Sequence, residues 1–381
     1  MNIIYFDNSA TAIPNPKAYE AFTSASGMYA NPSSLHAFGL ETRKMLEKAR
    51  ADVASAFCCS PDEITFTSSG TEANNIAVIS SARKNRHAGN VIVTAKAEHP
   101  SVTETVKFLE KEGFRAVYVP VTGGSVDYDA LADILSAEKV CLVSLMQANN
   151  QNGAVTDLKK VRDVISSTGS KALFHSDCVQ GFLKVPDNMR AYAARYCDTA
   201  SVSAHKVGGF KGTGALFVRK GLVLSPVIYG GGQERGLRSG TENVAGICAF
   251  AEAAKAFDNS YRAKITRLRE LFIEKAASKL GSSIDFRIPE THIDALLNIS
   301  LKNVKSEVAL NYLSGKGVCV SSSSACSSKA KENTVLASFG YGKDYEISSL
   351  RIGFSPFNTE DEVEILVNEL ANAAAFRMKG K

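Results

Sequence analysis

The feature that most constrains the fold is a regular alternation of helical and strand-like segments from about residue 35 to about residue 220. Leu46, Ala49, Val53 and Phe57 fall at helical spacing, and the apolar run ITFTSS follows them as a predicted strand. The same alternation continues through GTEANNIAVISSAR, NVIVTAKA, SVTETVKFLEKEG and RAVYVPV, and further strands are predicted in VCLVSLMQA, ALFHSDCVQ, DTASVSA and GALFV. Strands that alternate with helices of this length predict an α/β fold with a mostly parallel central sheet covered on both faces.

The alternation stops after about residue 240. TENVAGICAFAEAAKAF and YRAKITRLRELFIEKAASKL predict one long helix or two successive helices with no strand between them. A last helix is predicted to begin at Thr359, with Glu362 three residues on in a capping-box pattern. We therefore expect a large α/β domain over residues 14–255 and a smaller α+β domain made of residues 1–13 and 256–381.

Composition excludes several classes of protein. An apolar fraction of 45% and a charged fraction of 22% are typical of a globular chain of this length, 381 residues. No apolar run approaches the length of a membrane helix, and the N-terminal stretch lacks the pattern of a signal peptide. The net charge of +5 is not gathered into a basic block. We expect a cytoplasmic protein that binds neither nucleic acid nor membrane.

The eight cysteines form neither CxxC pairs nor a disulfide-like framework. In a reducing compartment most of them are expected to be small buried side chains, and this includes the adjacent Cys58 and Cys59 at the end of a predicted helix. His87 and His292 have no partner at metal-ligand spacing, so we predict no metal site.

The strand ends hold the residues that could carry chemistry, because ligands bind beyond the carboxyl ends of the strands in open α/β sheets. In TSSGTEANN, Gly70 and Thr71 pass from strand to helix, and a helix N-terminus can bind a phosphate. A plain helix cap is the alternative. The chain contains no P-loop motif, and its G-T-G precedes a strand rather than a helix, so it is not a dinucleotide fingerprint.

Three further strand ends carry polar residues. His99 follows a strand in AEHPS and is either a hydrogen-bonded structural residue or a catalyst. ALFHSDCVQ places His175 and Asp177 on one face of a strand, where the carboxylate suits either a cationic ring nitrogen or a helix cap. Lys206 follows SVSA at another strand end. It is either an ordinary surface charge or an amine tuned to act as a nucleophile.

One cofactor requires a set of groups that is found in this sequence, namely Lys206, Asp177 and the helix start at Gly70–Thr71. Pyridoxal phosphate needs a lysine for its aldehyde, an acid for its pyridine nitrogen and a site for its phosphate. The appearance of all three at successive strand ends favours this cofactor over the separate alternatives.

The motif series resembles that of the cysteine desulfurases. It consists of YFDNSATAIPNP, NPSSLHAFGLETRKMLEKAR, SSGTEANN, EHPSV, DCVQ, SAHK, GGQERGLRSGT, SSSSACSS and SSLRIGFSPFNTEDE. These are pyridoxal-phosphate enzymes of the class-V aminotransferase type, of the kind serving iron–sulfur cluster assembly and nitrogen fixation. The resemblance extends from residue 5 to beyond residue 360 and implies the fold-type-I transferase architecture that is also found in aspartate aminotransferase.

The resemblance implies a role for each matching cofactor-site residue. Lys206 would bind the cofactor covalently and later move the Cα proton, and His99 would stack on its ring. Asp177 would pair with the ring nitrogen, and Gln180 would contact the ring hydroxyl. The remaining cofactor contacts implied are Gly70, Thr71, Ser203 and His205 at the phosphate, Asn150, and Thr241, which would reach the phosphate of a neighbouring subunit in a homodimer.

The resemblance also implies the substrate and the nucleophile. Asn150 and Arg351 would bind the carboxylate of L-cysteine, a task that suits the planar guanidinium group. Cys326, in a polar loop at about residues 320–345, would take the substrate sulfur as a persulfide, leaving L-alanine. Lys329 and Lys331 would favour its thiolate. The sulfur would then pass to an acceptor protein, such as a scaffold protein, for iron–sulfur cluster or thio-cofactor biosynthesis.

The sequence departs from the usual family motifs at NNQNG, SSSSAC, FKGTG and SPFNTEDE, and none of these departures removes a reacting group. Two alternatives stay open. One is a different reaction on the same fold, such as selenocysteine lysis or transamination. The other is a sulfur-relay protein without turnover, against which the set of Lys206, His99, Asp177 and Cys326 argues.

Overall fold

A seven-stranded sheet forms the centre of the large part of the molecule. The computed structural model describes residues 3–122, 124–322 and 334–376. The strand order is β2-β10-β9-β8-β7-β3-β4, with parallel pairs from β9 to β4 and with β10 antiparallel to both of its neighbours. The strands are β2 (Ile64–Thr67), β3 (Val91–Thr94), β4 (Arg115–Tyr118), β7 (Val140–Ser144), β8 (Leu173–Asp177), β9 (Thr199–Ser203) and β10 (Gly214–Val218).

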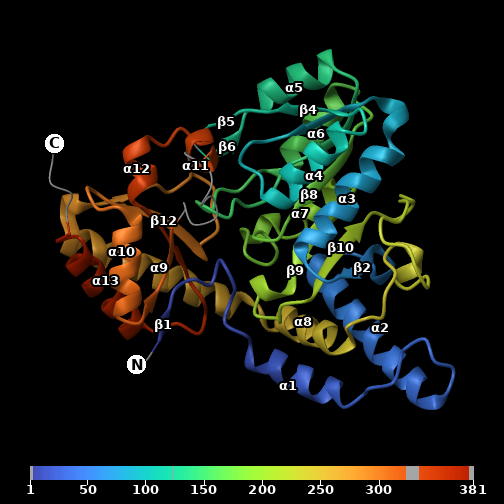
Figure 1. Ribbon diagram of the computed structural model, residues 1–381, viewed down its shortest axis with the longest axis horizontal. Coiled ribbons are helices and arrows are strands. Elements are labelled where there is room, and N and C mark those ends of the chain that lie inside the picture. The colour runs from blue at the N-terminus through green and yellow to red at the C-terminus, as the bar shows by residue number, and fades with distance from the viewer. Residues whose placement is uncertain (1–2, 123, 323–333, 377–381) are drawn as a thin grey trace.

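Helices cover both faces of this sheet because its strands are apolar on both sides. Ile92 and Leu142 pack in one cluster with α3 and α4, whereas Val91, Val93 and Val143 face the opposite way, into a cluster with α2, α5 and α6. These helices are α2 (Ala37–Phe57), α3 (Gly70–Lys84), α4 (Pro100–Glu110), α5 (Tyr128–Ala137) and α6 (Leu158–Ser167). Three short elements also belong to this part, β5 (Val121–Thr122), β6 (Ser125–Val126) and α7 (Tyr192–Tyr196). Below the sheet in Figure 1, helix α1 (Pro16–Ser26) packs on helix α8 (Val244–Ala256).

The C-terminal third builds a second, antiparallel sheet of order β11-β12-β15-β14. Its strands are β11 (Ile284–Phe286), β12 (Leu296–Leu301), β14 (Ser321–Ser322) and β15 (Ser349–Gly353), and its helices are α9 (Asn259–Leu280), α10 (Ser306–Gly315), α11 (Thr334–Ser338), α12 (Lys343–Ser348) and α13 (Glu360–Ala373). The N-terminal strand β1 (Ile4–Tyr5) joins this part by pairing with β13 (Val318–Cys319). Figure 1 shows both chain ends on this side of the molecule.

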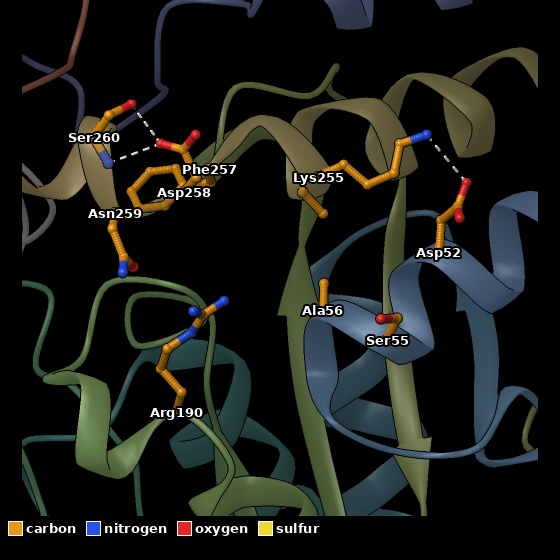
Figure 2. A pocket seen from close by; sticks show the side chains of 10 residues that line it. Asp52, Ser55, Ala56, Arg190, Lys255, Phe257, Asp258, Asn259 and Ser260 are labelled. Carbon is orange, nitrogen blue, oxygen red and sulfur yellow. Dashed lines mark hydrogen bonds and ion pairs between the residues drawn. The ribbon is translucent and has the colours of Figure 1, made fainter.

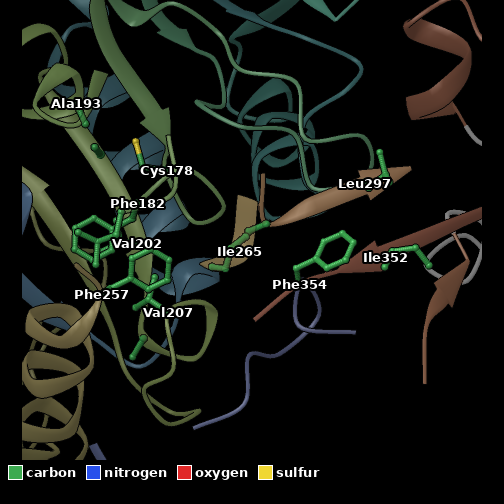
Figure 3. Close-up of a cluster of buried hydrophobic side chains, with 14 of the residues drawn as sticks. Cys178, Phe182, Ala193, Val202, Val207, Phe257, Ile265, Leu297, Ile352 and Phe354 are labelled. Atoms are coloured by element: carbon green, nitrogen blue, oxygen red, sulfur yellow. The ribbon is translucent and has the colours of Figure 1, made fainter. Parts of the chain in front are cut away.

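One hydrophobic cluster connects the two parts. Phe182 belongs to the large part, Ile265 to α9 and Phe354 follows β15, and all three side chains are buried in the same cluster (Figure 3). Phe257, in the connection between α8 and α9, packs in this cluster as well. The two sheets therefore share a continuous core, which fixes the residues that face the space between them.

The structure tests three of the expectations drawn from the sequence, on the segment after residue 240, the capping box and Cys58. The segment after residue 240 forms two helices, α8 and α9, and the predicted capping box at Thr359 and Glu362 is present. The expectation that Cys58 is buried was wrong, because Cys58 is the left-handed C-cap of α2 with φ 62° and its side chain is exposed. Among the described helices, none is both long enough and apolar enough to cross a bilayer.

Candidate active site

A cavity of about 310 Å³ lies at the carboxyl ends of the parallel strands. Residues that follow β2, β3 and β7, together with the last residues of β8 and β9, converge there because parallel strands end at the same edge of a sheet. The predicted site residues that line it are Gly70, Thr71, His99, Asn150, Asp177, Gln180, Ser203, His205, Lys206 and Arg351. Thr241 does not line this cavity, and Cys326 lies outside the described residues.

One end of the cavity is suited to an anion. Gly70 begins α3, and a side chain at this position would collide with Val179, since an added Cβ would lie 2.5 Å from Val179 Cγ2. The missing Cβ leaves the helix N-terminus open to the cavity. Ser203 Oγ is buried and has no hydrogen-bond partner among the described residues, so a donor is available there. Burial and the charge of Lys206 lower the pKa of His205 to about 4.

The cavity is also lined by a carboxylate and an imidazole. Asp177 Oδ1 accepts from the Val179 backbone N–H at 2.9 Å, and its Oδ2 accepts from Asn74 Nδ2 at 2.7 Å. His99 is the N-cap of α4, with its Nδ1 accepting from the Ser101 backbone N–H at 3.1 Å. Burial lowers the pKa of His99, the charge of Asp177 opposes that shift, and the charge of Lys206 adds to it.

Lys206 reaches the cavity from the short helical turn Ala204–Lys206 that follows β9. Its Nζ donates to the carbonyl oxygens of Ser9 and Ala10, each at 2.7 Å. Gln180 Nε2 donates to the same Ser9 carbonyl at 2.8 Å. The N-terminal segment therefore positions both the amine and the amide that the sequence analysis assigned to one cofactor.

A second amine lies beside this group. Lys184 Nζ donates to Gln180 Oε1 at 3.3 Å. Burial, together with the positive charge of Lys206, lowers the pKa of Lys184 to about 7. Some of the Lys184 side chain stays accessible through a neighbouring cavity that it lines together with Lys206. A second lysine therefore lies next to the site, although it does not line the strand-end cavity itself.

Arg351, on β15, reaches the cavity from the second sheet. Its two terminal nitrogens donate to the Asn150 carbonyl oxygen at 3.0 Å and to Asp7 Oδ1 at 3.2 Å. Ser321 Oγ donates to the same Asp7 oxygen at 2.6 Å. The Arg351 Nε is buried and has no partner among the described residues, so the guanidinium can still donate to a carboxylate in the cavity.

Sequence reasoning missed several residues that contact the predicted site residues. Asn74 and Asp7 stand in the quoted motifs TEANN and YFDNSAT, but nothing in the residue pattern shows which partner each would meet. Lys184 follows DCVQ by a few residues, and its lysine type alone does not separate it from a surface charge. Their roles became visible only through the contacts above.

A larger open groove, of about 520 Å³, lies elsewhere and contains none of the predicted site residues (Figure 2). Several of its polar groups pair with one another, since Lys255 contacts Asp52 at 3.4 Å and Asp258 accepts from the backbone and hydroxyl of Ser260, whereas Arg190 Nε has no partner among the described residues. Within the described ranges no cluster of three or more His, Cys, Asp or Glu side chains could hold a metal ion. The strand-end cavity is therefore the candidate site.

Comparison with known proteins agrees with this geometry. The family model for class-V aminotransferases matches residues 4–366.

The chain belongs to the class-V aminotransferase family.

Members of this family use pyridoxal phosphate, and the fold class and the resemblance to cysteine desulfurases predicted from the sequence are both confirmed. The putative cysteine desulfurase IscS 1 of Bacillus subtilis (strain 168) is 35% identical over 98% of this class-V chain and 98% of its own length. A solved NifS-like protein superimposes with a TM-score of 0.90 at 33% identity, covering 98% of this chain and 100% of that one. The structure of SspA in complex with cysteine superimposes with a TM-score of 0.78 at 26% identity, covering 93% and 99% of the two chains.

Proposed function

We propose that this protein is a cysteine desulfurase that converts L-cysteine to L-alanine and transfers the sulfur to Cys326. One observation carries the proposal. A single cavity brings together the Lys206 amine, the Asp177 carboxylate, the His99 ring and the Arg351 guanidinium. The similarity to named cysteine desulfurases over nearly the whole chain supports the reaction, and the cysteine complex of the similar SspA supports the substrate.

The residues present fit pyridoxal phosphate. The open start of α3 at Gly70 and the unpartnered hydroxyl of Ser203 suit its phosphate. Asp177 suits a protonated ring nitrogen, and Lys206 suits the aldehyde. When bound, the cofactor supplies a ring that accepts electrons from a bond broken at the substrate Cα. The other proposed contacts are His99 on the ring face, Gln180 at the ring hydroxyl, Asn150, and Thr71 and His205 at the phosphate.

The substrate carboxylate is proposed to bind Arg351 and Asn150, because Arg351 Nε is buried without a partner beside Asn150 in the cavity wall. Lys206 Nζ then moves the proton of the substrate Cα, and His99 assists the proton transfer at its ring nitrogen. Both groups act in a pocket that excludes bulk water on the sheet side, since Asp177 and Gln180 are buried.

Sulfur transfer is assigned to Cys326. Its thiolate attacks the substrate sulfur, so that a sulfur–sulfur bond forms while the carbon–sulfur bond breaks and its electron pair stays with the carbon fragment. That fragment takes up protons and leaves as alanine, and Cys326 keeps the sulfur as a persulfide. A thiol reductant or an acceptor protein, such as a scaffold for iron–sulfur clusters, then removes it.

The assembly and its setting are also part of the proposal. Residues 14–255 are assigned to the cofactor domain, and residues 1–13 with 256–381 to the small domain that carries the cysteine loop at about 320–345. Thr241 is proposed to complete the phosphate site of a second copy, because it stands outside the cavity of its own chain. The protein is accordingly a homodimer, and we assign it to the cytoplasm.

One assay tests the reaction. Purified protein loaded with pyridoxal phosphate should convert L-cysteine to equal amounts of alanine and sulfide when a reductant is present. Cys326→Ala should abolish both products, whereas Cys58→Ala, which removes an exposed thiol outside the cavity, should leave them unchanged. Normal desulfuration by Cys326→Ala would refute the persulfide route. Turnover of selenocysteine alone would favour a lyase instead.

A further inference from the structure

The single amide group of Asn74 connects Asp177 with Ser101, the residue that contacts His99. Asn74 lies on α3 with 1% of its surface exposed, so its polar atoms must find partners inside the protein. Nδ2 donates to Asp177 Oδ2 at 2.7 Å and to Ser101 Oγ at 2.8 Å, while Oδ1 lies 3.2 Å from His175 Nε2. Both N–H groups and the oxygen of the amide are therefore used.

The orientation of this amide is fixed by its neighbours. A reversed amide would place its oxygen against the Asp177 carboxylate, where neither atom could donate. In the observed orientation Asn74 Oδ1 only accepts, so His175 Nε2 must carry the proton, and His175 Nδ1 accepts from the Thr199 hydroxyl at 3.1 Å. Burial lowers the pKa of His175 to about 3, so the ring is neutral at pH 7 and carries a single N–H.

At Asp177 the amide fixes the carboxylate plane. Asn74 holds one oxygen and the Val179 backbone N–H holds the other, from opposite sides of the group. With both oxygens held, rotation about the Cβ–Cγ bond would break at least one hydrogen bond. The carboxylate therefore keeps one orientation toward the cavity that it lines.

The same amide influences His99 through the hydroxyl group of Ser101. Because Ser101 Oγ accepts from Asn74, its own hydrogen is free to point at His99 Nδ1, which lies 2.8 Å away. The Ser101 backbone N–H also donates to that nitrogen, at 3.1 Å. Two donors on Nδ1 exclude a proton there, so the ring proton of neutral His99 sits on Nε2.

We propose that Asn74 is a positioning residue whose single amide sets the orientation of the Asp177 carboxylate and also directs the Ser101 hydroxyl at His99 Nδ1, which strengthens the tautomer that the Ser101 backbone N–H already favours. This inference rests on the proposed function, which assigns electron withdrawal to Asp177 and proton transfer to His99. Asn74 couples them, because the amide that holds the carboxylate also directs the hydroxyl that donates to the imidazole.

The first test uses cofactor-free protein and requires no turnover. The chain has six histidines, so nitrogen NMR of histidine-labelled protein resolves each ring. In the wild type, His99 should carry its proton on Nε2. Ser101→Ala removes the hydroxyl that donates to Nδ1 and should raise the fraction of His99 rings protonated at Nδ1 by about fivefold, the equivalent of one hydrogen bond. Asn74→Leu leaves the hydroxyl in place without its orienting donor and should raise that fraction by a smaller factor.

Asn75→Leu is the matched control. Asn75 is the next residue of α3, and its side chain donates to the Ser101 carbonyl oxygen, so this variant removes a bond between α3 and α4 without touching Asp177 or the Ser101 hydroxyl. It should leave the His99 ring unchanged. An unaltered His99 ring in Ser101→Ala, or an equal change in Asn75→Leu, would overturn the proposal, and the Ser101 variant decides the question if Asn74→Leu does not fold.

The second readout is cofactor affinity, measured by titrating each apoprotein with pyridoxal phosphate. Asn74→Leu should raise the Kd by about tenfold or more, as expected for a lost hydrogen bond to a charged group. Ser101→Ala keeps the hydrogen bond between Asn74 and Asp177, so this variant should raise the Kd much less. Equal increases in the Kd of the two variants would contradict the proposed role of Asn74. If the wild type made no alanine from cysteine while both readouts behaved as stated, the proposed function would fail and the network would stand.

Discussion

The ring of His175 has no exposed surface, so its protonation is coupled to folding. Burial lowers its pKa to about 3, whereas an unfolded histidine titrates near 6.5. Between these values the unfolded chain binds a proton that the folded chain does not, so the free energy of unfolding falls as the pH drops below about 6.5.

This predicts a measurable contribution from one residue. As the pH falls over this range, the free energy of unfolding should decrease more steeply for the wild type than for His175→Gln. The two slopes should differ by roughly 1 kcal/mol per pH unit, which corresponds to the uptake of one proton. Urea unfolding at pH 7, 6 and 5 measures both slopes. Identical slopes would show that the buried ring takes up its proton without unfolding.

The sequence was sufficient to predict that Lys206 and Asp177 lie in one cavity, but it was not sufficient to predict the side chains that contact them. Lys206 and Asp177 stand in short motifs at strand ends, where the chain direction alone brings them to one edge. The partners Asn74 and Asp7 depend on which side chains face each other across the fold, and no local pattern contains that information. Cys58 was placed wrongly because it is the left-handed C-cap that follows α2 rather than part of the buried face of that helix.

At the scale of elements, the loop that carries Thr241 is anchored by a buried ion pair. Arg50 on α2 contacts both carboxylate oxygens of Glu234, at 2.7 and 2.8 Å, and only 4% and 1% of the two side chains are exposed. Glu234 also accepts from the Phe66 backbone N–H at 2.8 Å. This contact ties the segment before Thr241 to the edge strand β2.

Removing one partner should therefore be costly. Arg50→Met leaves a buried charge without its partner and should destabilise the protein by about 3 to 5 kcal/mol, while adding Glu234→Gln should recover part of the loss. Arg115→Met, which breaks an exposed ion pair with Glu138, is the control and should cost less than about 1 kcal/mol. Thermal unfolding of the four proteins compares them. An equal cost for both single variants would mean that the buried pair does not anchor the loop.

The strands were predictable from their composition, but the direction of β10 was not recognised. GALFV reads as one more strand, yet only residues 204–213, a single helical turn and a loop, separate it from β9. A parallel neighbour needs a crossover of roughly a dozen residues or more, usually a helix. The short connection from Ser203 to Gly214 explains why β10 runs antiparallel, and it was a signal that the sequence already contained.

At the scale of the whole molecule, the position of Thr241 outside its own cavity makes the second copy part of the proposed site. Lys206→Ala removes the amine from one chain, and Thr241→Asp places a negative charge where the proposal puts the partner's phosphate. Each variant alone should be inactive. A hybrid of the two should regain about half of the wild-type activity, because one of its sites combines an intact Lys206 with an intact Thr241.

Co-expression with two different affinity tags and purification through both isolates the hybrid. A hybrid that stays inactive, with wild-type controls carrying the same tags active, would place Thr241 at its own chain's site, and an active Thr241→Asp variant on its own would place it at none.

The central claim is that the Lys206 amine holds the cofactor. Borohydride treatment of the loaded protein makes a link between an amine and the cofactor aldehyde permanent, and peptide mass spectrometry then locates it. The account predicts the cofactor mass on the peptide that contains Lys206, and its absence in Lys206→Ala. A label on Lys184, the amine next to the site, or no label at all, would contradict this claim.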